Sequence, residues 1–415
     1  MDETRRRLLQ ALATAPALGR GAIAGAAAGA AASASRLAFA ADGRQSGHTV
    51  VVVFLRGALD SVGALIPSDE SAYYDRRPGI AVPRAGQIDL DGQFALHDAL
   101  RPLQALYQQG HLAFVVGTGL DSASSTRSHF DAQARMEGGL SGRSSAEGWL
   151  GRHLALRAGD GDPVFRGVGI GSIGGMLRGY DDALNVNDLS SLRLRPPNDV
   201  TAFELDTTLA ALYGQTSRPL LRGQSDRALN TLHLATVRNL GHGTDAGRFG
   251  PLRFGREMRQ VAELIRAALG LEAATVDMGG WDLHDSYGDW RNGAMQGQLK
   301  ELAEGLATFH ETIGGRPDVT VVVMSEFGRR LEENSSYGTD HGKGGMMMVL
   351  GGGVRGGRVA GRWSGLGSLV DGDLPVTTDY RQVLSELLTR RLGGGDAVGH
   401  VFPGYRPPGW LDLFA

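Results

Sequence analysis

Five short apolar runs constrain the fold of this chain more than any other feature. In runs such as HTVVVVFL and VTVVVM, β-branched side chains follow one another with almost no polar alternation. Continuous runs of this length predict strands that are buried on both faces of a sheet. The predicted strands are His48–Leu55, Leu112–Thr118, Ala273–Met278, Val319–Met324 and Gly345–Leu350.

Segments with helical spacing of apolar residues lie between these strands. Leu299, Leu302 and Leu306, for example, share one face of a predicted helix. Strands that alternate with helices predict an α/β fold, with a mostly parallel sheet and helices on both faces. Residues 158–250 are less regular and are predicted to be an insertion of loops and helices. The predicted helices are Ala95–Gln108, His129–Glu137, Ala146–Arg157, Thr201–Tyr213, Asp226–Leu240, Arg253–Leu269, Met295–Ile313 and Tyr380–Leu392.

Composition and charge exclude several classes of protein. The 415 residues are 42% hydrophobic and 21% charged, which is typical of a globular chain and excludes a disordered one. The formal net charge is -3, so nucleic acid is not expected as a partner. The chain has no cysteine, which excludes disulfides, thiolate zinc sites, iron–sulfur clusters and cysteine nucleophiles.

Residues 1–40 have the layout of a cleavable export signal. The segment TRRRLL is followed by a stretch rich in alanine and glycine and by the site Ala38-Phe39-Ala40. Paired arginines before leucines resemble the twin-arginine signal of bacteria, so we expect the export machinery as a partner and a periplasmic or secreted protein. An amphipathic surface helix is the alternative. No run of ~20 strongly apolar residues predicts a stable membrane anchor.

Carboxylates and histidines gather next to the ends of the predicted strands. In an open α/β sheet, ligands bind beyond the carboxyl ends of the strands. Carboxylate and imidazole are the metal ligands that remain in a chain without cysteine, so the pattern predicts a divalent metal site for zinc, manganese, calcium or magnesium. The residues are Asp60, the segment Ser124–His129, Asp282, His284, Glu326, Asp340 and His341.

Each piece of this pattern also has an ordinary structural interpretation. Asp60 could cap a helix. Glu326, at the end of a buried strand, could pair with Arg329. The Asp340–His341 pair could be ordinary loop polarity. In an extended segment, Asp282 and His284 would point the same way as a pair of ligands, and the ordinary alternative is a turn with a solvated histidine.

Taken in order, the motifs LRGALD, RSHFDAQ, GGWDLH, SEFGR and DHG, with the arginine-rich leader, resemble a bacterial family. It is a family of twin-arginine-exported, sulfatase-like proteins labelled a domain of unknown function. The resemblance covers nearly the whole chain after residue 40. The family is similar to the alkaline phosphatase superfamily, which includes sulfatases, phosphodiesterases and cofactor-independent phosphoglycerate mutases.

The resemblance implies a single alkaline-phosphatase-like domain over residues 41–415, interrupted by the insertion. It also implies a nucleophile within Ser124–Ser128, with Ser128 the first candidate and Thr126 the second. His129 lies beside that nucleophile, and Arg127 and Arg329 are candidates to hold anionic oxygens. A sulfatase that needs formylglycine made from cysteine is excluded. The implied metal ligands are Asp60, Asp282, His284, Glu326, Asp340 and His341.

These features predict an exported, metal-dependent hydrolase of phosphate or sulfate esters, which would act on an anionic ester substrate. The alternative is a non-catalytic binding or assembly protein on the same scaffold, serving a cell-surface polymer. A metal-free esterase that uses Ser128 is a third hypothesis. The chain has no G-x-S-x-G motif, which weighs against that third hypothesis.

Overall fold

The computed structural model describes residues 47–415 apart from 122–123, 141–144, 160, 172–173 and 199. The predicted export signal, residues 1–40, lies outside the described residues. Contacts divide the chain into two compact units: the larger comprises Arg44–Ala158, Pro163–Leu189 and Gly241–Ala415, and the smaller includes Ser190–Leu240. In the part of the chain that is described, no helix is long and apolar enough to cross a membrane.

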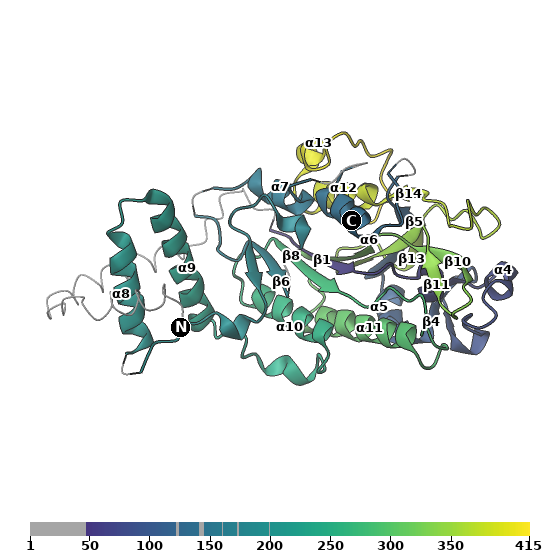
Figure 1. The fold of residues 1–415 in the computed structure, drawn as a ribbon, viewed down its shortest axis with the longest axis horizontal. Coiled ribbons are helices and arrows are strands. Elements are labelled where there is room, and N and C mark those ends of the chain that lie inside the picture. The colour runs from purple at the N-terminus through teal and green to yellow at the C-terminus, as the bar shows by residue number, and fades with distance from the viewer. Residues whose placement is uncertain (1–46, 122–123, 141–144, 160, 172–173, 199) are drawn as a thin grey trace. The chain divides into compact units, whose positions relative to one another are not determined.

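A nine-stranded sheet forms the centre of the larger unit (Figure 1). Its order is β13-β5-β12-β9-β1-β8-β6-β7, with β14 beside β5. Every neighbouring pair is parallel except the two that involve β12, which is antiparallel to β5 and β9. The predicted α/β class with a mostly parallel sheet is therefore confirmed. The strands are β1 (Thr49–Leu55), β5 (Leu112–Gly119), β6 (Gly167–Ile170), β7 (Leu184–Val186), β8 (Ala273–Met278), β9 (Val319–Ser325), β12 (Gly345–Leu350), β13 (Arg358–Gly361) and β14 (Thr378–Asp379).

The strand directions bring one set of loops to a single edge of the sheet. Because β1, β5, β8 and β9 run the same way, their carboxyl ends meet there. β12 runs in the opposite direction, so the segment that precedes it reaches the same edge. Residues 340–342, which come before a strand, therefore lie with residues that follow strands.

Helices cover both faces of the sheet (Figure 1). The helices on one face are α6 (His129–Gly138), α7 (Trp149–Ala155), α12 (Tyr380–Arg390) and α13 (Val398–Val401), and those on the other are α10 (Arg253–Arg266) and α11 (Ala294–Thr312). Successive residues of a strand point to opposite faces. Val50, Val52 and Phe54 of β1 accordingly share a buried core with Trp149 of α7 and Leu384 of α12.

Two smaller sheets flank the main one. One pairs β10 (Arg329–Glu333) with β11 (Thr339–His341), and the other has the order β2-β4-β3, with β2 at Leu65–Pro67, β4 at Phe94–His97 and β3 at Gln87–Asp89. The short helices α3 (Ser61–Ala64) and α4 (Ser71–Asp75) lie along the chain between β1 and β3.

The predicted helix Ala95–Gln108 is wrong over its first half. Phe94–His97 forms β4, a 3-10 helix follows at Asp98–Leu103, and only Gln104–Gln108 is the α-helix α5. The His97 ring accepts a hydrogen bond from the Ala99 amide at 3.0 Å and caps the 3-10 turn. Pro102 lacks an amide hydrogen, so a continuous α-helical ladder could not form there.

The smaller unit is a pair of helices, α8 (Ala202–Gly214) and α9 (Pro219–Val237). Thr201 and Glu204 form a reciprocal capping box at the start of α8. Pro219 occupies the first turn of α9, where a missing amide hydrogen costs nothing, so this helix begins earlier than the predicted Asp226.

Candidate metal centre

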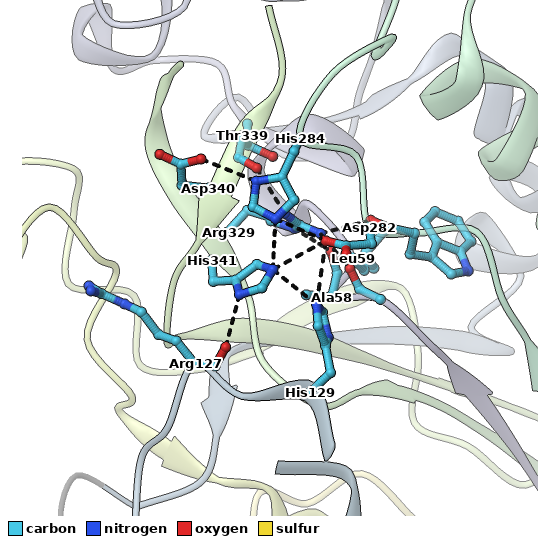
Figure 2. Close-up of polar contacts among 12 residues, drawn as sticks. Ala58, Leu59, Arg127, His129, Asp282, His284, Arg329, Thr339, Asp340 and His341 are labelled. Atoms are coloured by element: carbon cyan, nitrogen blue, oxygen red, sulfur yellow. Dashed lines mark hydrogen bonds and ion pairs between the residues drawn. The ribbon is translucent and has the colours of Figure 1, made fainter. Parts of the chain in front are cut away.

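Four polar side chains converge at the sheet edge where β1, β5, β8 and β9 end. His129 is the first residue of α6, Asp282 and His284 follow β8, and His341 ends β11. Figure 2 shows the rings of His129, His284 and His341 pointing toward one another beside the Asp282 carboxylate. Segments that are far apart in the sequence thus place three imidazoles and one carboxylate together. We call these four residues the cluster.

The nitrogens of the cluster lie within hydrogen-bonding distance of one another. The Nε2 atom of His341 lies 2.9 Å from Nε2 of His129 and 2.8 Å from Nε2 of His284. Asp282 Oδ1 lies 3.2 Å from the same His341 atom and 3.1 Å from Nε2 of His284. The ligand atoms of His129, Asp282 and His341 all lie within 4.8 Å of one another, a grouping able to hold a metal ion.

The outer nitrogen of each ring has its own acceptor. Nδ1 of His129 donates to the Glu326 carboxylate at 2.7 Å. Nδ1 of His284 donates to Asp340 at 3.2 Å. Nδ1 of His341 donates to the backbone carbonyl of Arg127 at 2.8 Å.

With the proton of each neutral ring on Nδ1, each Nε2 directs a lone pair at the others. This outer arrangement is the one that histidine ligands of metals use. Arg329 Nη1 already donates to Nε2 of His284 at 3.3 Å, and a metal cation would compensate the remaining lone pairs and the carboxylate oxygen. The donor set therefore fits a divalent metal ion.

Glu326 is fully buried and held by several donors. It accepts hydrogen bonds from the Gly57 amide at 2.8 Å, from Gln133 Nε2 at 2.8 Å and from Ser325 Oγ at 2.9 Å. Burial acts to raise its pKa, but hydrogen bonds from His129 and Gln133 outweigh burial and lower the pKa below its ordinary value. Glu326 is thus an ionised acceptor that orients His129.

Arg329 fixes the position of Asp282. This buried guanidinium donates to the carbonyls of Gly57 at 2.6 Å and Ala58 at 2.9 Å, and to Asp282 Oδ1 at 2.5 Å. Partial burial acts to raise the pKa of Asp282, but the hydrogen bond and the charge of Arg329 lower it to about 2. Asp282 is therefore a carboxylate throughout the neutral range.

The turn after β1 is shaped to pack against Asp282. Ala58 has a φ of 66°, in a region that side chains other than glycine rarely occupy. Gly57 has a φ of 117°, and a Cβ added to it would lie 2.4 Å from the Asp282 amide nitrogen. Backbone strain of this kind gathers at functional sites, where the surrounding contacts hold it in place.

A family model described as a protein of unknown function, DUF1501, matches residues 48–389. The chain belongs to the DUF1501 family. The match includes every residue of the cluster and its three outer acceptors. A search of the curated proteins found no match.

Asp60, predicted as a metal ligand, lies apart from the cluster of this DUF1501 protein. Its buried carboxylate forms a two-point ion pair with Arg77, at 2.5 and 3.0 Å, and accepts a hydrogen bond from the Tyr287 hydroxyl at 2.6 Å. Burial acts to raise the pKa of Asp60, but the charge of Arg77 lowers it below its ordinary value. The carboxylate is thus neutralised by a buried arginine from just after α4.

The other predicted ligands divide into two groups. The structure brings Asp282, His284 and His341 together at the centre. Glu326 and Asp340 instead accept hydrogen bonds from the outer nitrogens of His129 and His284.

The predicted nucleophiles lie in the loop that leads into α6. Ser128 is the N-cap of α6, and its Oγ accepts a hydrogen bond from the Asp131 amide at 3.4 Å. Thr126 Oγ1 accepts from the Ser128 amide at 3.2 Å. Within the described part of the chain, neither hydroxyl hydrogen-bonds to a residue of the cluster.

The two arginines expected to hold anionic oxygens have other partners. Arg329 is occupied by backbone carbonyls, by Asp282 and by His284 Nε2, which lies 3.3 Å from its Nη1. The Arg127 guanidinium pairs with Asp373 at 2.6 Å.

Sequence reasoning treated His129 as a neighbour of the nucleophile and missed its place in the cluster. It also missed Gln133, which donates to Glu326 one helical turn after His129. The spacing of four residues between His129 and Gln133 puts both on one face of a helix, and this signal was present in the motif RSHFDAQ.

Proposed function

We propose that this protein is a metal-dependent hydrolase of anionic esters, either phosphate or sulfate. The observation that carries the proposal is the cluster itself: three imidazoles, each oriented by an outer acceptor, and one carboxylate at the carboxyl edge of an α/β sheet. A bound divalent ion would polarise the ester and activate a nucleophile. The order of motifs that resembles the alkaline phosphatase superfamily supports the same reaction class.

The ligand types favour particular metals. Imidazole nitrogen suits zinc, whereas calcium and magnesium prefer oxygen ligands throughout. With three histidines to one aspartate, zinc is the first candidate and manganese the second.

The residues around the cluster have distinct roles in this proposal. His129, His284, His341 and Asp282 hold the metal. Glu326, Asp340 and the Arg127 carbonyl keep each Nε2 directed inward. Arg329 holds Asp282 and offsets its charge.

Ser128 is the proposed nucleophile, with Thr126 second. Ser128 adjoins His129, and the N-terminal amides of α6 favour negative charge at its Oγ. Its cap bond uses the oxygen as an acceptor and leaves the hydroxyl proton free to be removed. Loss of turnover in Ser128→Ala with metal content preserved supports this role. Loss of turnover in Thr126→Ala alone would assign the role of nucleophile to Thr126. Turnover in both variants would assign that role to a water molecule.

The exported state is also a proposal. The family match begins at residue 48, downstream of the predicted cleavage site after Ala40. Replacing Arg5 and Arg6 by lysine keeps the charge but removes the arginine pair that the export receptor reads. We expect the precursor to remain in the cytoplasm on cell fractionation. Normal processing of this variant would contradict the twin-arginine route.

The function is tested by elemental analysis of the full chain followed by turnover of aryl phosphates, aryl sulfates and phosphodiesters. His341→Ala should lose both metal and turnover. His111→Ala is the matched control, because His111 also contacts another imidazole but lies at the opposite edge of the sheet. Stoichiometric metal with no turnover of any ester would contradict the hydrolase proposal and favour a non-catalytic binding or assembly protein.

A further inference from the structure

Three basic side chains surround one buried carboxylate close to the cluster. Arg127 Nη2 lies 2.6 Å from Asp373 Oδ2. Lys343 Nζ lies 3.8 Å from the same oxygen, and Arg330 Nε lies 3.8 Å from Oδ1 of Asp373. The three cations come from the loop before α6, from β10 and from the segment before β12, so the fold gathers them.

Only one of the acids that face these cations is buried. Asp373 has no exposed surface, and its carboxylate hydrogen-bonds only to Arg127 within the described part of the chain. Asp371 is 78% exposed and 4.0 Å from Lys343 Nζ, and Asp340, which is 53% exposed, lies on β11, the strand that pairs with β10 and its Arg330. No hydrogen bond from the Lys343 ammonium occurs among the described residues. Arg330 Nη2 donates to the Asp371 carbonyl at 3.2 Å, and all three basic side chains remain between 31% and 39% exposed.

The chain connects this basic group to the cluster. Arg127 provides the carbonyl that accepts from His341, and Lys343 comes two residues after His341. Arg330 follows Arg329, which holds Asp282. Figure 2 shows the Arg127 side chain directed away from the converging rings. The cations thus stand beside the cluster, where they would meet a different part of a bound molecule.

We propose that Arg127, Arg330 and Lys343 form a second oxyanion subsite, so that the substrate carries an anionic group in addition to the one that reacts. Buried Asp373 holds the three cations in place, and a sulfate or phosphate oxyanion accepts hydrogen bonds from their exposed donors. A linear polyanion that bears many such groups satisfies both sites at once. That the bound polyanion is a substrate rests on the proposed function, whereas binding of the polyanion at this subsite does not.

The subsite is tested by binding of dextran sulfate and of polyphosphate to the full chain in the presence of a chelator, with neutral dextran as the ligand control. The double variant Arg330→Gln, Lys343→Gln should raise the Kd about 10-fold at an ionic strength of about 50 mM, where screening is weak. The slope of log Kd against log salt should fall by about one for each lost contact. The polymer that binds more tightly identifies the oxyanion as sulfate or phosphate.

Arg316→Gln is the matched protein control. Arg316 is 46% exposed and pairs with Asp318, which precedes β9 and so lies at the opposite edge of the sheet. The chain as a whole is negative, at -3, so general attraction to a polyanion does not produce the effect. Unchanged binding in the double variant, or an equal loss in Arg316→Gln, overturns the subsite. Because the assay needs neither metal nor turnover, failure of the hydrolase proposal leaves this result readable.

Discussion

Histidines contact one another at both edges of the central sheet, but only one edge forms a cluster. At the amino edge, His111 precedes β5 and its Nδ1 lies 3.1 Å from Nε2 of His310 at the end of α11. At the carboxyl edge, His129, His284 and His341 meet Nε2 to Nε2. Short contacts between imidazoles therefore do not by themselves mark a metal site.

The difference lies in what the outer nitrogens do. The His111 Nδ1 is used up in the contact with His310, so one ordinary hydrogen bond satisfies both rings. In the cluster, all three Nδ1 atoms donate outward to Glu326, Asp340 and a backbone carbonyl, so every inner nitrogen can act as an acceptor, and that of His284 accepts from Arg329. Acceptors that face one another need a cation, and this is what separates a ligand set from a buried pair.

The largest expected effect comes from removing one histidine at each edge. His341→Ala should reduce the metal content from stoichiometric to below about a tenth, because His341 contacts every other member of the cluster. The loss of affinity should exceed the 10–100-fold that loss of an outer partner typically causes. His111→Ala should keep its metal. Elemental analysis of the two purified variants measures this difference. Equal metal content in both would contradict the claim that metal binds at the carboxyl edge of the sheet and not at the amino edge.

An intermediate effect is expected from the outer acceptors. Glu326→Gln keeps the shape of the side chain but removes the charge that orients His129. We expect the metal Kd to rise roughly 10–100-fold, as measured by competition with a chromophoric chelator. Glu272→Gln serves as the control, because Glu272 also accepts from a buried histidine, His153, away from the cluster. A Glu326→Gln variant with native affinity would show that the outer acceptors do not matter.

Metal removal should lower the thermal stability by a moderate amount. A ligand present at 100 times its Kd stabilises the folded state by about 2.7 kcal/mol. In a protein of this size, that corresponds to a fall in Tm of about 3 °C on adding chelator. The same shift should persist in His111→Ala and vanish in His341→Ala, as followed by calorimetry. A wild-type Tm that is indifferent to chelator would speak against bound metal.

The smallest expected effect is a pH dependence at the amino edge. Burial, assisted by the charge of His111, lowers the pKa of His310 below its ordinary value of 6.5. Between the two pKa values the unfolded chain binds a proton at His310 that the folded chain does not. The contribution of neutral His310 to the free energy of unfolding is therefore fully present above pH 6.5 and falls as the pH drops toward the lowered pKa. In His310→Gln, the decline in unfolding free energy between pH 7 and about pH 5 should be shallower, as measured in urea. A decline of unchanged steepness would contradict this.

The sequence predicted the sheet better than it predicted the roles of the residues around it. Runs such as Val50–Leu55 are typical of strands between two apolar layers, so the burial of these strands could be predicted from the local sequence alone. The alternation of Asp282 and His284 likewise placed both on one side of an extended segment, and both reach the cluster.

Asp60 shows what the sequence could not reveal. It follows β1 at the expected edge, but its role depends on Arg77, which the packing of the segment after α4 brings into the interior. Glu326 and Asp340 lie at the expected edge, yet whether a carboxylate joins the cluster or accepts a hydrogen bond from a histidine ring behind it depends on distances of a few ångströms. Those distances are set by tertiary contacts, among them the Gln133 and Asn334 amides that hold the two carboxylates.

The central claim is that His129, Asp282, His284 and His341 bind one divalent metal ion through the inner histidine nitrogens. An anomalous difference map from crystals of the full chain, recorded at the absorption edge of the metal found by elemental analysis, tests it most directly. The account predicts a single peak about 2.0–2.2 Å from the Nε2 atoms and from an Asp282 oxygen. A map with no peak at this point, or with metal bound at the Nδ1 side of the rings, would contradict it.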